Sequence, residues 1–190
     1  MKLSPYLLAL LFVIASCAGN DGTDLTPELP AESTHEQFFS NLFSLCGETF
    51  TGESTYPENS DHVLVDTELV VNISTCTPER IEVMLFRDGD TWHATWILEK
   101  REGGLHLYHD HIGDKEYAEG EEPLTGYGGY ADDRGSATQQ YFPADQHTAD
   151  ILPEAATNVW MMDMDLVNGV FVYSLERHNE PRFRAEVYLN

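Results

Sequence analysis

Apolar and polar residues alternate along much of the chain after residue 47. Alternation with a period of two is the pattern of β-strands that bury one face. The segment 91–99 places apolar residues on one face of an expected strand and mostly polar residues on the other: Trp92, Ala94, Trp96 and Leu98 against His93, Thr95, Ile97 and Glu99. Nine short segments rich in β-branched and aromatic residues are predicted as strands: 48–56, 66–74, 80–87, 91–99, 104–111, 136–142, 157–166, 169–177 and 182–189.

Short turn sequences separate several of these segments, at 88–90 (DGD), 102–104 (EGG) and 168–169 (NG). The last is the dipeptide favoured in two-residue type I′ hairpins. Tight turns join antiparallel neighbours, so we expect a mainly β fold. The pattern predicts a single antiparallel up-and-down β-barrel of about nine strands with a short N-terminal helix. A two-sheet β-sandwich is the alternative.

Helical patterns occur at two places. From Thr34, which can cap a helix, apolar residues fall on one broad face until Gly47 ends it: Phe38, Phe39, Leu42, Phe43 and Leu45. A small helix is predicted at 144–151, after Pro143. The segment 112–135 is rich in acidic residues, tyrosine and glycine. It is predicted as a long loop, of a kind that often binds or covers a ligand.

The N-terminus has the layout of an export signal. Lys2 precedes an apolar run at 6–14, which is too short for a membrane span of about 20 residues. The run leads into 14–17 (IASC), which resembles the bacterial lipobox. The resemblance implies that residues 1–16 are a signal peptide and that Cys17 receives a lipid, whose acyl chains bind the protein to a lipid bilayer. An ordinary signal peptide cut at a small residue is the alternative.

Residues 17–34 have the composition of a flexible acidic tether. They contain Pro27 and Pro30 and no basic residue. The barrel domain is therefore predicted at 35–190. Ala18 follows the cysteine, where enterobacterial lipoproteins that stay in the inner membrane carry aspartate. By this resemblance the outer membrane is favoured.

The chain has three cysteines, an odd number for an exported protein. Lipidation of Cys17 leaves Cys46 and Cys76 as an even pair in an oxidising compartment. We predict that they form a structural disulfide, closing a loop of about 30 residues. Two buried free thiols are the alternative.

The charge is strongly negative, with 33 acidic and 10 basic residues and a formal net charge of −23. Such a field repels nucleic acid, so we expect no nucleic-acid partner. It suits cationic ligands or divalent ions, although solubility alone also accounts for it.

Two resemblances concern the domain itself. The segment 45–52 (LCGETFTG) resembles the opening strand of calycins, the lipocalin-like barrels. The segments 107–111 (LYHDH) and 142–145 (FPAD) resemble an uncharacterised family of secreted bacterial proteins, which implies no known activity.

The candidate chemistry centres on the segment 105–111 (LHLYHDH). Its odd-numbered positions share a face, so His109 and His111 point into the barrel if Leu105 and Leu107 do. We predict a ligand site there, with Tyr108 and His93 as further members. Histidine near its ordinary pKa also suits proton transfer.

Two histidines at i and i+2 on a strand can also reach one metal. A divalent metal is therefore a second candidate for His109 and His111. The third ligand would come from His93, His147 or a loop carboxylate. The alternative is a pair of histidines that line a cavity and hydrogen-bond to their neighbours.

Three classes of function remain. The sequence contains no nucleophile elbow, phosphate-binding loop, dinucleotide fingerprint or His-Glu-x-x-His motif. We favour a barrel that binds a small ligand without catalysis, because barrels of this size can hold one. A hydrolase or lyase that uses His109 and His111 and a purely structural envelope protein are the alternatives.

Overall fold

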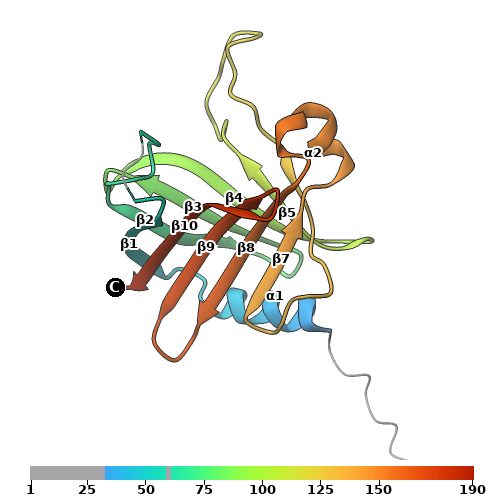
Figure 1. Ribbon diagram of the computed structural model, residues 1–190. Coiled ribbons are helices and arrows are strands. Elements are labelled where there is room, and N and C mark those ends of the chain that lie inside the picture. The colour runs from blue at the N-terminus through green and yellow to red at the C-terminus, as the bar shows by residue number, and fades with distance from the viewer. Residues whose placement is uncertain (1–32, 59–60) are drawn as a thin grey trace, which may run out of the picture. The chain divides into compact units, whose positions relative to one another are not determined.

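The computed structural model describes residues 33–58 and 61–190 as a mainly β domain (Figure 1). The signal peptide, the lipobox with Cys17 and nearly all of the tether lie outside these residues. Among the described residues, no helix is long and apolar enough to cross a membrane. The elements are α1 (Thr34–Ser44), β1 (Thr49–Tyr56), β2 (Leu69–Cys76), β3 (Arg80–Arg87), β4 (Thr91–Arg101), β5 (Gly104–Asp110), β6 (Tyr127–Tyr130), β7 (Gln139–Pro143), α2 (Gln146–Ile151), η1 (Pro153–Ala155), β8 (Asn158–Asp165), β9 (Val170–Arg177) and β10 (Glu180–Leu189).

Ten antiparallel strands form one sheet in the order β6-β5-β4-β3-β2-β1-β10-β9-β8-β7. Consecutive strands are neighbours, except that β1 pairs with β10 and that β6 and β7 form the two edges. The edges meet through two backbone hydrogen bonds, from Asp132 N to Tyr141 O and from Asp145 N to Gly128 O. The result is a nearly closed up-and-down barrel of calycin-like form, which confirms the predicted fold class and not the sandwich.

The tenth strand, β6, falls inside the segment predicted as a loop. Its sequence is YGGY, and glycine is depleted in strands because it packs no side chain. Here the glycines are required by close packing against the strands on either side, β5 and β7. A Cβ on Gly129 would collide with the Pro143 carbonyl, and one on Gly128 with the Leu107 carbonyl. The Thr148 hydroxyl bonds both the N–H and the C=O of Gly128, which ties β6 to α2.

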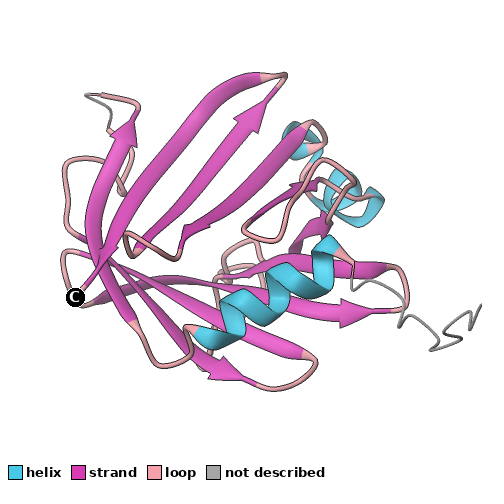
Figure 2. Ribbon diagram, turned by 90° about the horizontal axis from the view of Figure 1, so that it is seen from below, coloured by secondary structure: helices cyan, strands magenta, loops and turns pink. Residues whose placement is uncertain are grey.

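The helix α1 lies across one end of the barrel (Figure 2). It buries Phe38, Phe39 and Leu42 against the inward-facing side chains of the sheet. Its cap is Ser33, whose hydroxyl accepts a hydrogen bond from Glu36 N, and not the predicted Thr34. This end of the barrel is therefore closed by a packed apolar plug.

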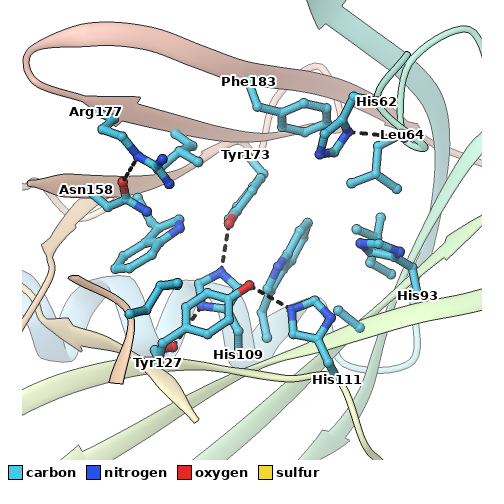
Figure 3. Close-up of a pocket in the computed structure, with 16 residues that line it drawn as sticks. His62, Leu64, His93, His109, His111, Tyr127, Asn158, Tyr173, Arg177 and Phe183 are labelled. Atoms are coloured by element: carbon cyan, nitrogen blue, oxygen red, sulfur yellow. Dashed lines mark hydrogen bonds between the residues drawn. The ribbon is translucent and has the colours of Figure 1, made fainter. Parts of the chain in front are cut away.

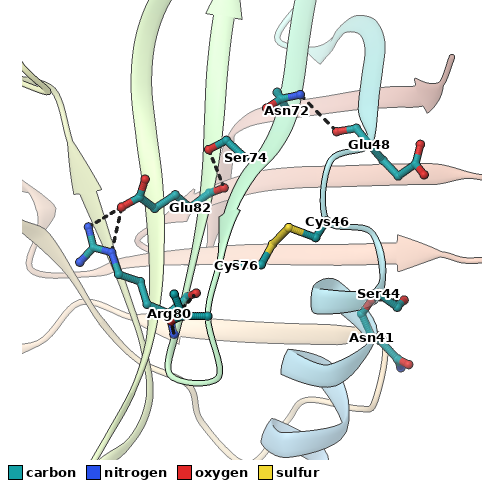
Figure 4. Close-up of a disulfide and its surroundings, with 10 residues drawn as sticks. Asn41, Ser44, Cys46, Glu48, Asn72, Ser74, Cys76, Arg80 and Glu82 are labelled. Carbon is teal, nitrogen blue, oxygen red and sulfur yellow. Dashed lines mark hydrogen bonds and ion pairs between the residues drawn. A yellow bond between two sulfur atoms is a disulfide. The ribbon is translucent and has the colours of Figure 1, made fainter.

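A disulfide joins Cys46, just after α1, to Cys76 at the end of β2 (Figure 4). Their Cα atoms are 6.2 Å apart. The predicted pairing is confirmed, and it fastens the plug helix to the sheet.

The turn chemistry differs from the prediction at the hairpin that contains Asn168 and Gly169. Between β8 and β9 the connection has four residues, 166–169, because Asp165 pairs with Val170. Only Gly169 in it has a positive φ, so it is not a type I′ turn. That geometry occurs instead between β9 and β10, where His178 and Asn179 have φ of 57° and 60°. His178 and Asn179 thus both adopt the left-handed conformation that this turn requires.

Candidate functional site

A cavity of about 170 Å³ lies inside the barrel (Figure 3). Its walls come from the start of β4, the end of β5, the start of β8 and the end of β9, and α1 lies at the opposite end of these strands. The lining includes five aromatic side chains, four histidines and two other polar residues: Trp96, Tyr127, Trp160, Tyr173, Phe183, His62, His93, His109, His111, Asn158 and Arg177.

Leu105 and Leu107 point into the core, as the site prediction requires. His109, next but one along β5, therefore also points inward and is only 3% exposed. Its Nδ1 is 3.0 Å from the Tyr127 carbonyl oxygen and its Nε2 is 2.7 Å from the Tyr173 hydroxyl. Both ring nitrogens are thus held by the protein itself.

The protonation state of His109 follows from these contacts. A carbonyl oxygen only accepts, so Nδ1 carries the hydrogen and donates it to Tyr127. Burial lowers the pKa of His109 to about 3, and the ring is neutral at pH 7. Nε2 must then accept a hydrogen bond from the Tyr173 hydroxyl. This pair locks one tautomer of His109 and one orientation of the Tyr173 O–H.

His111 lies beside His109 at the wall of the cavity, and its Nε2 is 2.7 Å from the Tyr127 hydroxyl. Burial lowers the pKa of His111, although a hydrogen bond with the His93 backbone acts in the opposite direction. Burial also raises the pKa of Tyr127 to about 12, so that phenol stays protonated. The structure therefore brings the two predicted histidines together in an uncharged hydrogen-bonded cluster.

His93 joins the cluster because β4 bulges. Leu85 pairs with Ala94 and Phe86 with Trp92, so His93 is the extra residue of the bulge. The bulge turns His93 into the cavity and Trp92 to the outer surface, where strict alternation predicts the reverse. Burial is the main cause that lowers the pKa of His93 to about 4, and the neighbouring ring of His111 adds to it. Neither of its ring nitrogens has a hydrogen-bond partner among the described residues.

Aromatic side chains from both sides of the barrel line the cavity. Trp96 stacks on Tyr173 with ring centroids 4.0 Å apart, and Trp160 lies 5.0 Å from the ring of His109. Next to them, Arg177 donates from Nε to Oδ1 of Asn158 at 2.8 Å. No aspartate or glutamate lines the cavity among the described residues, and Arg177 is the one arginine or lysine in this described lining.

Two predicted members of the site lie elsewhere. Tyr108 follows the outward phase of β5, and its hydroxyl accepts a hydrogen bond from Arg80 Nη1 at 2.8 Å on the outer face. His147 is exposed on α2. The long predicted loop contributes one side chain to the wall, that of Tyr127. Assignment of Tyr108 to the cavity was wrong, because neighbouring residues on a strand face opposite sides.

The arrangement does not favour a metal centre. In the described part of the chain, no group of three or more histidine, cysteine, aspartate or glutamate side chains is placed to hold a metal ion. Both nitrogens of His109 are engaged, which leaves it no lone pair for a metal.

Sequence reasoning missed the wall formed by β8 and β9. One signal for it exists in the alternation of β9, in which Arg177 continues the inward phase of Phe171, Tyr173 and Leu175. A charged residue in the buried phase of a strand is unusual and marks a position with a specific role.

The chain matches no known protein-family model, and no curated protein or solved structure shows significant similarity to it.

Proposed function

We propose that this protein is a lipid-anchored barrel that binds a small ligand of about one aromatic ring without changing it chemically. The observation that carries the proposal is the 170 Å³ cavity and its aromatic lining. An apolar cavity of about 150 Å³ is large enough to bind benzene. The size therefore fits one ring with a small substituent.

The state of His109 favours binding over a hydrolase or lyase that would use it as a base. A general base needs a free nitrogen within reach of its substrate. His109 uses both nitrogens internally, and its low pKa makes it a weak base. The fixed Tyr173 hydroxyl instead has its oxygen lone pairs left to accept a hydrogen bond from a ligand.

A purely structural barrel would be expected to fill its interior. At the α1 end the barrel does so, with side chains such as Phe38, Phe50 and Phe171. At the other end the side chains leave a cavity unfilled. One of its lining residues is the small Ala94, which is itself only 1% exposed. This difference between the two ends supports a ligand site.

The disulfide supports the lipid anchor. Cys46 and Cys76 are joined, so Cys17 is the one thiol of the sequence left over. A disulfide also fits a protein exported to an oxidising compartment. We therefore keep the bilayer as a partner through the acyl chains of Cys17, with the outer membrane as the favoured location.

The ligand site is tested by titrating small aromatic compounds and by introducing a larger side chain into its wall. Benzyl alcohol, phenol and indole are titrated into the purified protein by isothermal calorimetry, and at least one is expected to bind. Ala94→Leu adds bulk to the cavity wall and should weaken that binding at least tenfold. Ala118→Leu makes the same change at an exposed position and should leave binding unchanged. Absence of binding by all three rings, or equal binding by Ala94→Leu, contradicts the proposal.

A further inference from the structure

No described carboxylate forms an ion pair with Arg177, although the chain has 33 acidic and 10 basic residues. Nine of the basic residues lie in the described ranges, and six of them have a carboxylate oxygen within 4.0 Å: Arg80, Arg87, Lys100, Arg101, Arg134 and Arg184. Arg177 is one of the three that have none there, and it alone of the three lines the cavity. Its guanidinium therefore lies at the ligand site without an ion-pair partner among the described residues.

Asn158 holds this guanidinium in place. The amide is only 4% exposed, and its Oδ1 accepts the hydrogen bond from Arg177 Nε (Figure 3). The two terminal nitrogens, Nη1 and Nη2, have no hydrogen-bond partner in the part of the chain that the structure describes. Their N–H groups lie side by side in one plane, which matches the two oxygens of a carboxylate.

Apart from Arg177, the described lining of the cavity contains no arginine, lysine, aspartate or glutamate. Burial lowers the pKa of His93 and His109 to about 4 and 3, and no described carboxylate lines the cavity. A cationic ligand would find no opposite charge there, while an anion would find one. The net charge of −23 repels an anion. Physiological salt screens exposed charges beyond about 8 Å, so this repulsion is weak at a distance from the surface.

We infer that the ligand is an aromatic acid with a single ring, whose carboxylate is bound by Arg177 and whose ring lies among the aromatic side chains of the cavity. The inference rests on the proposed function, since it names the chemical class that the same cavity takes. Hydrogen bonds to charged groups contribute enough for about a 10- to 100-fold gain in affinity. The acid should therefore bind that much more tightly than a neutral ring of the same size.

Benzoate, benzyl alcohol and benzylamine test this by isothermal calorimetry on the purified protein at pH 7. The wild type should bind benzoate at least tenfold more tightly than benzyl alcohol, and benzylamine most weakly. Arg177→Gln keeps a side chain that can bond Asn158 but removes the charge. It should lose the preference for benzoate, because its affinity for benzoate falls at least tenfold more than its affinity for benzyl alcohol. Arg182→Gln removes an equal charge from an exposed position and should behave as the wild type.

The outcomes separate the two proposals. Binding of benzyl alcohol without preference for benzoate, or a preference that survives in Arg177→Gln, overturns the aromatic acid and leaves the ligand site standing. If none of the three probes binds the wild type, the ligand site itself fails. Retained benzyl alcohol binding by Arg177→Gln shows that the variant is folded. If Arg177→Gln no longer binds benzyl alcohol, Arg177→Lys is tested in its place. That variant keeps the charge, so the inference then requires it to bind benzoate tenfold more tightly than benzyl alcohol.

Discussion

The buried His109 should make the protein sensitive to mild acid. Its pKa is lowered to about 3 in the folded state by burial, against about 6.5 in the unfolded chain. A histidine with a lowered pKa takes up its proton only on unfolding, so stability is full above pH 6.5 and falls as the pH drops toward 3. Between pH 7 and pH 5 this one group should reduce the free energy of unfolding by about 2 kcal/mol.

The variant His109→Gln removes the titrating ring and keeps an amide that can donate to the Tyr127 carbonyl or accept from the Tyr173 hydroxyl. We expect urea unfolding, followed by tryptophan fluorescence, to show a loss of stability between pH 7 and pH 5 that is about 2 kcal/mol smaller in this variant than in the wild type. With an m-value of about 2 kcal/mol per molar urea, the difference corresponds to about 1 M in the midpoint shift.

The control is His147→Gln, which removes an exposed histidine from α2 and should unfold with the pH dependence of the wild type. Carboxylates whose pKa is lowered, such as that of Asp145 with its hydrogen bonds from Thr148 and His106, act at lower pH and stay ionised over this range. Equal pH slopes for His109→Gln and the wild type would show that the ring is not held neutral in a buried site, and the reasoning about the cavity would have to be abandoned.

Three other predictions follow from the anchor, the disulfide and the core. Cys17→Ser should abolish incorporation of labelled fatty acid and release the protein from the membrane fraction; unchanged labelling would refute the lipobox assignment. Replacing Cys46 and Cys76 with serine should lower the free energy of unfolding by about 3–4 kcal/mol without changing the fold, measured by urea unfolding and circular dichroism, and a loss below 1 kcal/mol would contradict it. Leu107→Ala should cost about 2–5 kcal/mol in the same unfolding assay, because the side chain is fully buried, and a near-neutral effect would place it outside the core.

Alternation predicted most of the barrel because the strands have one buried face, and period two is a local property of the sequence. Alternation failed as a guide at two places where the structure depends on the neighbouring strands and not on the local sequence. At β6 the glycines that weaken a strand signal are the residues that let Gly129 approach the Pro143 carbonyl of the strand across the seam. At His93 an inserted residue reverses the phase, and no sequence rule reveals a bulge before the partner strand is known.

The site was half predictable for the same reason. His109 and His111 share one strand, so their common face follows from spacing alone. Tyr173, whose hydroxyl donates to Nε2 of His109, is 64 residues away in sequence. Arg177 meets the cavity only because β9 forms the opposite wall. A contact that depends on how the sheet curls closed cannot be inferred from the spacing within one strand.

The pairing of β1 with β10 has a consequence for how the chain folds. Phe50 lies opposite Leu189, near the two ends of the domain, whereas most other pairings join strands that follow each other in the sequence. Closing so long a loop costs conformational entropy before its contacts compensate, so we expect β1 and β10 to join late, in milliseconds to seconds. Until then β1 exposes an unpaired edge on which chains can aggregate. A chain that emerges with its N-terminus first would therefore depend on a chaperone to shield that edge until its last strand is available.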